Sequence, residues 1–272
     1  DHVGIIARTV EDAALILDVV GQPDRKKSSR IKRHKIKFSE KLNSGHDLSG
    51  IRIGIPKGFF FENVDDEILK ATHKVIKYLE TKGGCLCDVT LPNMDHTRTV
   101  SLTIQMPEAL SFHMPWLKDR SAAYSSDFLA GLALGQNILA EHYVKCKRML
   151  TNYRDSVDQL FEDVDVIITP STPIISPKLN CVNITTKGLT EPVGNAVTRF
   201  TSFFNMTGHP AITIPSGLNS KGLPMGVQLI GPQFGELSLL ALGKLIEENQ
   251  DFNIQKFHSV IISLIFFFHF IN

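Results

Sequence analysis

Two short apolar runs in the last third of the chain, Ala211–Pro215 and Met225–Gly231, give its clearest structural signal. A loop that contains Gly217, Gly222 and Pro224 separates them. Runs of this kind, bounded by Gly and Pro, predict two β-strands joined by a turn. Because apolar residues continue through each run without alternating with polar ones, we expect both faces of these strands to be covered, as in the middle of an α/β sheet.

A second pattern predicts a βαβ unit. Ile51–Pro56 is an apolar run typical of a strand, and Asp65–Lys82 has a helical apolar stripe that begins with an acidic cap. Gly83 and Gly84 end this helix, and Cys85–Leu91 is a second strand. Strand, helix and strand in close succession indicate parallel strands with a right-handed connection.

The remaining elements follow from similar periodicities. An apolar turn opens the chain, and Thr9 is expected to cap a helix that runs to Val20. Further predicted elements are helices over 101–120, 124–162 and 236–249, a strand over 165–169, and a lead into the paired strands over 198–207. We expect Met114 and Trp116 to pack inside the helical region. The polar segment 22–50 is typical of a mobile surface loop.

Composition narrows the function classes. Of the 272 residues, 43% are hydrophobic and 21% are charged, which is ordinary for a globular protein with its own core. The net charge of +1 gives no reason to expect a nucleic-acid partner, and the basic run Arg25–Lys37 is interpreted as a solvated loop.

The four cysteines, Cys85, Cys87, Cys146 and Cys181, lack zinc-site spacing. Cys85 and Cys87 share one face of a strand, and we interpret them as buried thiols. A reducing, cytoplasmic location is expected, while association with an organelle or membrane stays open.

Motifs with a known mechanism are missing from the sequence. It contains no G-x-S-x-G, no H-E-x-x-H, no phosphate-binding glycine loop and no G-x-G-x-x-G. The ten histidines are scattered, and His2, His113, His142 and His209 are interpreted as structural or surface residues. We therefore predict no metal site and no cofactor.

Three segments resemble the amidase signature family. The first is DHVGIIARTVEDAALILDVV at the start, and the second is VDVIITPSTPIISP, which has an Asp-x-x-x-x-Pro-x-x-Pro run similar to one often found in the family. The third contains the matching residues Asn205, Gly208, Pro210, Ala211, Ile214, Pro215, Gly217, Gly222, Pro224, Gly226, Gln228, Leu229 and Gly231. The resemblance extends from Asp1 to about Glu248 and corresponds to the C-terminal half of a family member.

The resemblance implies an α/β fold with a mixed central sheet covered by helices on both faces, here with the N-terminal half missing. It also implies hydrolysis of carboxamide C–N bonds through a Ser-Ser-Lys triad, in which a neutral Lys acts through a bridging Ser on the nucleophile. In the family these groups lie upstream of the segment that begins at Asp1. No Gly-Gly-Ser-Ser-Gly type run occurs here, and Lys57 matches a later strand exit rather than the catalytic lysine. We therefore expect no catalytic residue in this chain and no activity of the chain alone.

The segment Thr198–Phe204 corresponds to one that lines the acyl pocket in the family. Thr201 and Phe203 are the candidate substrate-binding residues, with core packing of the phenylalanines as the alternative. Glutamine-using amidotransferases of the family have an Asp where this chain has Thr198. That difference favours a general amidase with an apolar acyl group.

We expect two regions, 1–252 as the C-terminal portion of an amidase signature domain and 253–272 as a divergent apolar tail. The run Val260–Ile271 is too short to span a membrane as a helix. An aberrant tail is the favoured interpretation, with an interfacial membrane anchor and a buried strand as alternatives.

The function hypotheses are an inactive portion of an amidase, a non-catalytic binding module, and a relative of the A-type component of glutamyl-tRNA(Gln) amidotransferase. The expected partner is a small-molecule amide, bound only by the complete enzyme, and homodimer formation stays open.

Overall fold

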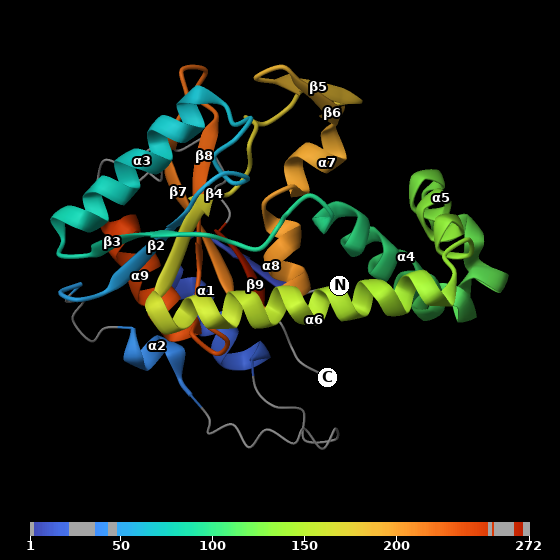
Figure 1. Ribbon diagram of the computed structural model, residues 1–272, viewed down its shortest axis with the longest axis horizontal. Coiled ribbons are helices and arrows are strands. Elements are labelled where there is room, and N and C mark those ends of the chain that lie inside the picture. Colours follow the sequence, from blue (N-terminus) through green and yellow to red (C-terminus); the bar gives the residue numbers. More distant parts are fainter. Residues whose placement is uncertain (1–2, 22–35, 43–47, 250–251, 253–263, 269–272) are drawn as a thin grey trace.

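The computed structural model describes residues 3–21, 36–42, 48–249, 252 and 264–268 of the chain. A seven-stranded sheet lies at the centre, in the order β1-β9-β7-β8-β4-β2-β3 (Figure 1). Its strands are β1 (Val3–Ala7), β2 (Arg52–Pro56), β3 (Cys85–Val89), β4 (Val166–Pro170), β7 (Ala211–Leu218), β8 (Pro224–Ile230) and β9 (Leu264–Phe268). A separate antiparallel pair is made of β5 (Asn183–Thr186) and β6 (Leu189–Pro192).

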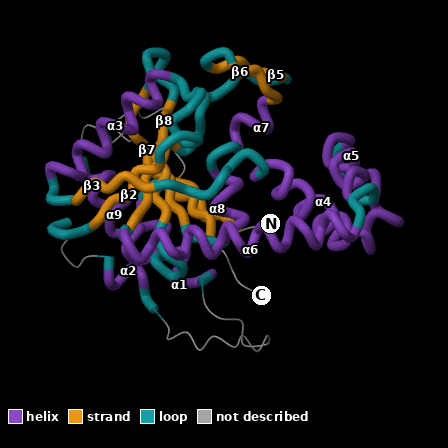
Figure 2. The backbone as a smooth tube through the Cα atoms, in the orientation of Figure 1, coloured by secondary structure: helices purple, strands orange, loops and turns teal. Residues whose placement is uncertain are grey.

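Helices surround this sheet, as Figure 2 shows. They are α1 (Val10–Val20), α2 (Phe38–Lys41), α3 (Asp66–Thr81), α4 (Thr97–Arg120), α5 (Ser126–Gly135), α6 (Ala140–Asp163), α7 (Val193–Thr198), α8 (Thr201–Thr207) and α9 (Glu236–Glu248), with a 3₁₀ turn at Ser121–Ala123. Helices α1, α3 and α9 share one hydrophobic core, and α4, α6 and α8 share a second one on the opposite face. The expectation of helices on both faces is confirmed.

The sheet is mixed, as expected. Strand β2 is parallel to β3 and β4, whereas β8 is antiparallel to β4 and β7. Ile53 in β2 lies opposite Leu86 in β3 and Val166 in β4. The predicted parallel βαβ unit and the predicted strand pair β7–β8 are both confirmed.

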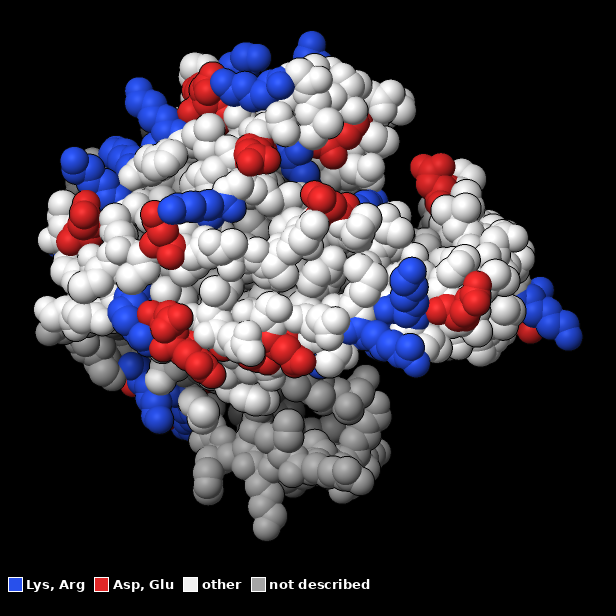
Figure 3. All heavy atoms as spheres, in the orientation of Figure 1, with Lys and Arg blue, Asp and Glu red and all other residues white. Residues whose placement is uncertain are grey.

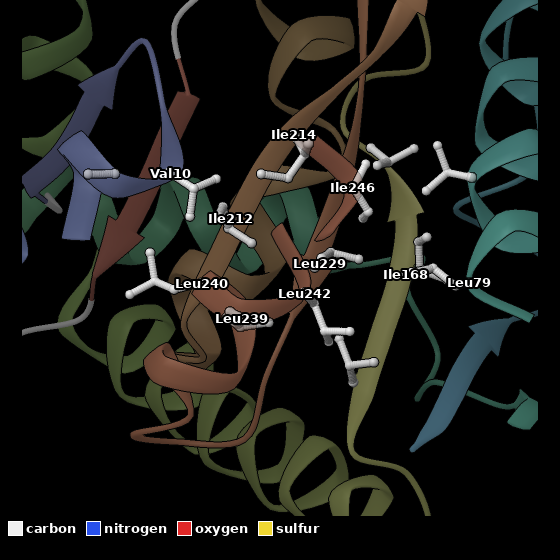
Figure 4. Packing of buried hydrophobic residues seen from close by; sticks show 14 of the residues in the cluster. Val10, Leu79, Ile168, Ile212, Ile214, Leu229, Leu239, Leu240, Leu242 and Ile246 are labelled. Atoms are coloured by element: carbon white, nitrogen blue, oxygen red, sulfur yellow. The ribbon is translucent and has the colours of Figure 1, made fainter. Parts of the chain in front are cut away.

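The β7–β8 hairpin contributes to both cores, which confirms that its apolar runs are covered on two sides. Ile212 and Leu229 are fully buried in the α1/α3/α9 core (Figure 4), while Ile230 is fully buried in the α4/α6/α8 core. Each such side chain contributes about 1.5–3 kcal/mol of hydrophobic stabilisation. A Cβ atom at Gly243 would lie 2.8 Å from Ile212 Cδ1, so α9 lies directly against β7.

The first helix begins where the sequence predicts. Thr9 Oγ1 accepts a hydrogen bond of 3.0 Å from Asp12 N, which confirms the cap. The apolar turn predicted before it is wrong, because the segment forms β1 and pairs with β9. A pairing partner from the other end of the chain leaves no local signal in the sequence.

Two further expectations about surface and core need correction. Part of the predicted mobile loop 22–50 is ordered, because Phe38–Lys41 is α2 and its Phe38 N donates to Asp18 Oδ1 at 2.5 Å. Residues 22–35 and 43–47 lie outside the described part. Cys85 is exposed and Cys87 is only half-buried, since β3 is the edge strand of the sheet.

Helices α4, α5 and α6 form an arm that projects away from the sheet in Figures 1 and 2. The prediction that this region is helical is confirmed, but the predicted packing of Met114 and Trp116 is wrong. These side chains are 50% and 40% exposed, because the distal part of the arm has no sheet to pack against. The segment 198–207 leads into the paired strands as expected, and it does so as the end of α7 and the whole of α8.

The apolar tail is described only at Leu264–Phe268, whose backbone forms β9 between β1 and β7. Of the three interpretations of the tail, a strand within the sheet fits this pairing. Residues 253–263 and 269–272 lie outside the described part. No helix among the described residues is at once long enough and apolar enough to cross a bilayer.

Gly131 and Gly135, one turn apart in α5, provide a test of how the arm is packed. A Cβ atom at Gly135 would lie 2.6 Å from Met106 O, whereas at Gly131 the nearest atom would be Met106 Sδ at 3.9 Å. We expect Gly135→Ala to destabilise the protein by about 1–3 kcal/mol through overpacking. Gly131→Ala, the matched control, should stabilise it by about 0.5–1 kcal/mol. Urea unfolding measures both, and equal effects would contradict the close contact of α4 and α5.

A half-buried carboxyl joins α9 to α1. Glu247 accepts hydrogen bonds from Val10 N through Oε1 at 3.1 Å and Oε2 at 3.2 Å. Burial raises the pKa of Glu247 from 4.5 to about 7, with a smaller contribution from nearby acidic residues, and the Val10 N–H opposes the rise. At pH values between these two pKa values, Glu247 is protonated in the folded state but has released its proton in the unfolded state. The free energy of unfolding therefore falls as the pH rises through this window.

Glu247→Gln should remove this decrease, because an amide keeps an acceptor for Val10 N but carries no charge. We expect stability near that of the wild type at about pH 4 and a gain of about 1 kcal/mol at about pH 8, after allowance for solvent screening. Urea unfolding at the two pH values is the measurement, with the exposed Glu162→Gln as control. A loss of stability at the higher pH would show that the charged carboxylate holds the two helices together.

Candidate functional site

The two predicted substrate-binding residues lie in α8 but in different surroundings. Thr201 is half-buried, and its Oγ1 is 3.5 Å from Thr198 O. Phe203 is fully buried, with ring centroids 5.6 Å from Tyr153 and 5.2 Å from Phe204. The position of Phe203 matches the core-packing alternative. Contact of either residue with a substrate stays a prediction.

A polar cluster surrounds the start of α8. Arg98 from α4 donates through Nη1 to Thr198 Oγ1 at 3.2 Å, and this hydroxyl donates in turn to Gly194 O at 2.8 Å. Arg199 Nη1 lies 3.3 Å from Glu191 Oε1, and its Nη2 donates to Asn63 O at 2.8 Å. The fold thus brings side chains from α4, β6 and the α7–α8 junction to one place.

The cluster has more positive than negative charge. Burial lowers the pKa of both Arg98 and Arg199, and Glu191, close enough to interact with both, opposes the change. The Nε atoms of both arginines are buried and have no hydrogen-bond partner among the described residues. Because buried guanidinium donors are costly to leave unmatched, this arrangement suits an added carbonyl or anionic oxygen.

His209 is part of a separate hydrogen-bonded chain. Its Nδ1 lies 2.9 Å from Thr207 Oγ1 and its Nε2 lies 3.1 Å from Asp158 Oδ1. The residue types resemble a hydroxyl–His–Asp triad, but both Thr207 and the His209 side chain are fully buried. A nucleophile and its base must be within reach of the substrate, and these buried side chains are not. The contacts therefore serve as a structural link between α8 and α6. The interpretation of His209 as a structural residue is confirmed.

Arg98 and Arg199 were missed by the sequence reasoning. Arg98 is 100 residues from Thr198 in the chain, and nothing in its local pattern distinguishes it from a solvated arginine. Three metal-ligating side chains do not come together anywhere in the described residues.

Comparison with known proteins identifies a family model and relatives that this chain resembles. The model of the family described as Amidase matches residues 1–240. An "Amidase" from Pseudomonas putida is 32% identical over 249 residues, covering 91% of this chain and 53% of that protein. The A-type component of glutamyl-tRNA(Gln) amidotransferase from Halothermothrix orenii is 27% identical, over 91% of this chain and 55% of its own length.

Solved structures agree with these matches. A protein from the complex described as "An unexpected vestigial protein complex reveals the evolutionary origins of an s-triazine catabolic enzyme" has a TM-score of 0.79 at 26% identity, over 89% of this chain and 52% of its own. A bacterial aryl acylamidase of the amidase signature family has a TM-score of 0.75 at 21% identity, over 90% of this chain and 52% of its own, which supports the fold alone. The chain spans about half the length of the curated relatives that it matches. From the match over residues 1–240 and the shared sheet and motifs, the chain belongs to the amidase family.

Proposed function

We propose that this chain is the scaffold portion of an amidase-type hydrolase that cleaves carboxamide C–N bonds, with the reactive Ser-Ser-Lys groups supplied by residues outside this sequence. The observation that carries the proposal is the coverage: the match takes in 91% of this chain but only 53% of the Pseudomonas putida amidase. The absence of a Gly-Gly-Ser-Ser-Gly type run from the sequence supports it further. On this proposal the chain alone is inactive.

Within the complete enzyme, the cluster at the start of α8 would hold the acyl part of a small amide. Thr201 offers a hydroxyl, and Arg98, which is bonded to Thr198, offers an unmatched donor. Phe203, two residues further along α8, is fully buried in the core. The carbonyl oxygen of an amide becomes more negative as the acyl-enzyme forms, so donors fixed by the fold would favour this step.

A glutamine-using amidotransferase is the second candidate, since components of such enzymes are among the relatives. The described geometry disfavours it for this chain. At the position where the resemblance implies an Asp that receives an ammonium group, Thr198 instead faces the Arg98 guanidinium. A cation beside this position would repel an ammonium group. A non-catalytic binding module is the remaining alternative.

The partners follow from the same proposal. A small amide is the expected ligand of the complete enzyme, without a nucleic-acid partner. Figure 3 shows basic and acidic side chains interspersed over the face displayed, without a broad basic surface of the kind that attracts a phosphate backbone. Homodimer formation and a weak membrane contact through the tail are further proposals. A cytoplasmic location is proposed from the cysteine content.

A serine-reactive fluorophosphonate probe tests the proposal that the nucleophilic serine lies outside this sequence. We expect no labelling of the 272-residue chain and no hydrolysis of an aryl amide, because the activated serine would lie outside it. A longer transcript that encodes a Gly/Ser-rich run and a lysine upstream of Asp1 should yield a protein that is labelled and hydrolyses the amide. Labelling of any serine within this chain would contradict the proposal.

The effects of two substitutions on stability test whether the arginine cluster stabilises the fold or is available for ligand binding. Arg98→Met should leave stability unchanged or raise it by about 1 kcal/mol, because it removes a poorly compensated, partly buried charge. Glu191→Gln should lower stability by about 1–3 kcal/mol, because both arginines lose their shared counter-charge. Thermal and urea unfolding of the chain measure both effects. A large loss of stability in Arg98→Met would assign Arg98 to the fold rather than to ligand binding.

A further inference from the structure

Helix α1 has apolar side chains on both of its sides. One side is buried in the core that it shares with α3 and α9, where Val10 belongs to the same cluster as Ile212 and Leu240 (Figure 4). The opposite side is exposed and consists of four large apolar side chains, Leu15, Ile16, Val19 and Val20. A helix that is apolar all round is normally covered on both sides. The outer side of α1 is therefore a surface that suits a partner.

The other two helices of this layer show the pattern that solvent contact produces. The exposed residues of α3 are all polar, namely Asp66, Lys70, His73, Lys74, Lys77, Glu80 and Thr81. Helix α9 exposes only Ser238 and Glu248. All three helices contribute to one core, so their inner sides are alike and only the outer side of α1 is different. Neighbouring apolar side chains left exposed in this way mark an interaction surface.

Strand β1, which precedes α1, is also only partly covered. It lies at one end of the sheet, and within the described residues it pairs with β9 alone. Ile5 is buried in the α1/α3/α9 core, whereas Ile6, which points to the other face of the sheet, is 59% exposed. The free edge of β1 offers backbone groups to a further strand, and its sequence VGIIA contains no charged residue that would oppose such pairing.

We call these three features the β1 end: the exposed side of α1, the Ile6 side chain and the free edge of β1. Together they call for a partner that adds a strand beside β1 and covers both faces of the sheet with apolar side chains. This is a continuation of the layered architecture already present in the chain. The length of the relatives supports such a continuation, because the match covers only 53% of the Pseudomonas putida amidase.

We propose that the β1 end binds the upstream portion of an amidase, and that it does so even when this portion is a separate polypeptide. The inference rests on the proposed function, which places the reactive groups in that portion, and it names the surface through which the two portions join. It also predicts that buried apolar surface and strand pairing hold them together without a covalent link.

Other occupants of the β1 end fit less well. A second copy of this chain would bring the same exposed strand and helix, but the curated relatives contain about as much further chain within one polypeptide. A membrane surface is disfavoured by charge. The exposed polar residues of α1, Glu11 and Asp12, are both acidic, and anionic lipids would repel them.

Co-expression tests the proposal. The tagged 272-residue chain is produced together with an untagged polypeptide, the part of the Pseudomonas putida amidase upstream of the matched region. We expect the two to co-purify in equal amounts, which native mass spectrometry measures, because each covers apolar surface that the other exposes. Purification of the 272-residue chain without the second polypeptide would overturn the proposal.

Substitutions on α1 locate the docking surface. The double variant Leu15→Gln with Val19→Gln should reduce the co-purified amount of the second polypeptide at least about tenfold, because it places polar amides where apolar contacts would form. Both side chains are exposed in this chain, so its own melting temperature should change little. Leu134→Gln with Val144→Gln in the arm is the matched control, since these side chains are 63% and 46% exposed, comparable with 56% for Leu15. Unchanged co-purification in the α1 variant, or an equal loss in the control, would overturn the assignment.

Two further measurements separate this inference from the proposed function and from self-association. Co-purification without fluorophosphonate labelling of the second polypeptide would support the docking surface but contradict the hydrolytic function. Labelling of the second polypeptide without co-purification would support that function and overturn the docking surface. Analytical ultracentrifugation of the 272-residue chain alone should show no dimer that depends on Leu15 and Val19. A stable dimer that the double variant dissociates would assign the β1 end to a second copy and overturn the proposal.

Discussion

The burial of the β7–β8 hairpin on both of its faces is the constraint on which the rest of the structure depends. Ile212 and Leu229 face the layer of α1, α3 and α9, while Ala211 and Ile230 face the layer of α4, α6 and α8. Strand β8 also pairs with β4, and β4 continues through β2 to β3. The hairpin therefore connects the two helical layers to the parallel part of the sheet, and neither core would close without it.

The same packing positions the candidate site. Gly208 caps the end of α8, and its positive φ of 81° permits the sharp entry into β7. Because β7 is fixed between two cores, α8 is fixed as well, and its first residue, Thr201, is held beside Thr198. The arginines then reach this point from α4 and from the α7–α8 junction. The cost of burying their charges with a single shared carboxylate falls on the stability of the fold.

The sequence by itself determined those features that depend on neighbouring residues. Apolar runs bounded by Gly and Pro indicated the β7–β8 hairpin, a capped apolar stripe indicated α3, and spaced motif residues indicated the family. Features that depend on distant partners were decided only by the tertiary structure. The strand β1 exists because β9 lies beside it, Cys85 is exposed because β3 is an edge, and Trp116 is exposed because the arm extends past the sheet. Arg98 and Arg199 became site candidates only when the fold brought residues 100 positions apart into contact, because a charge in a sequence carries no record of what will surround it.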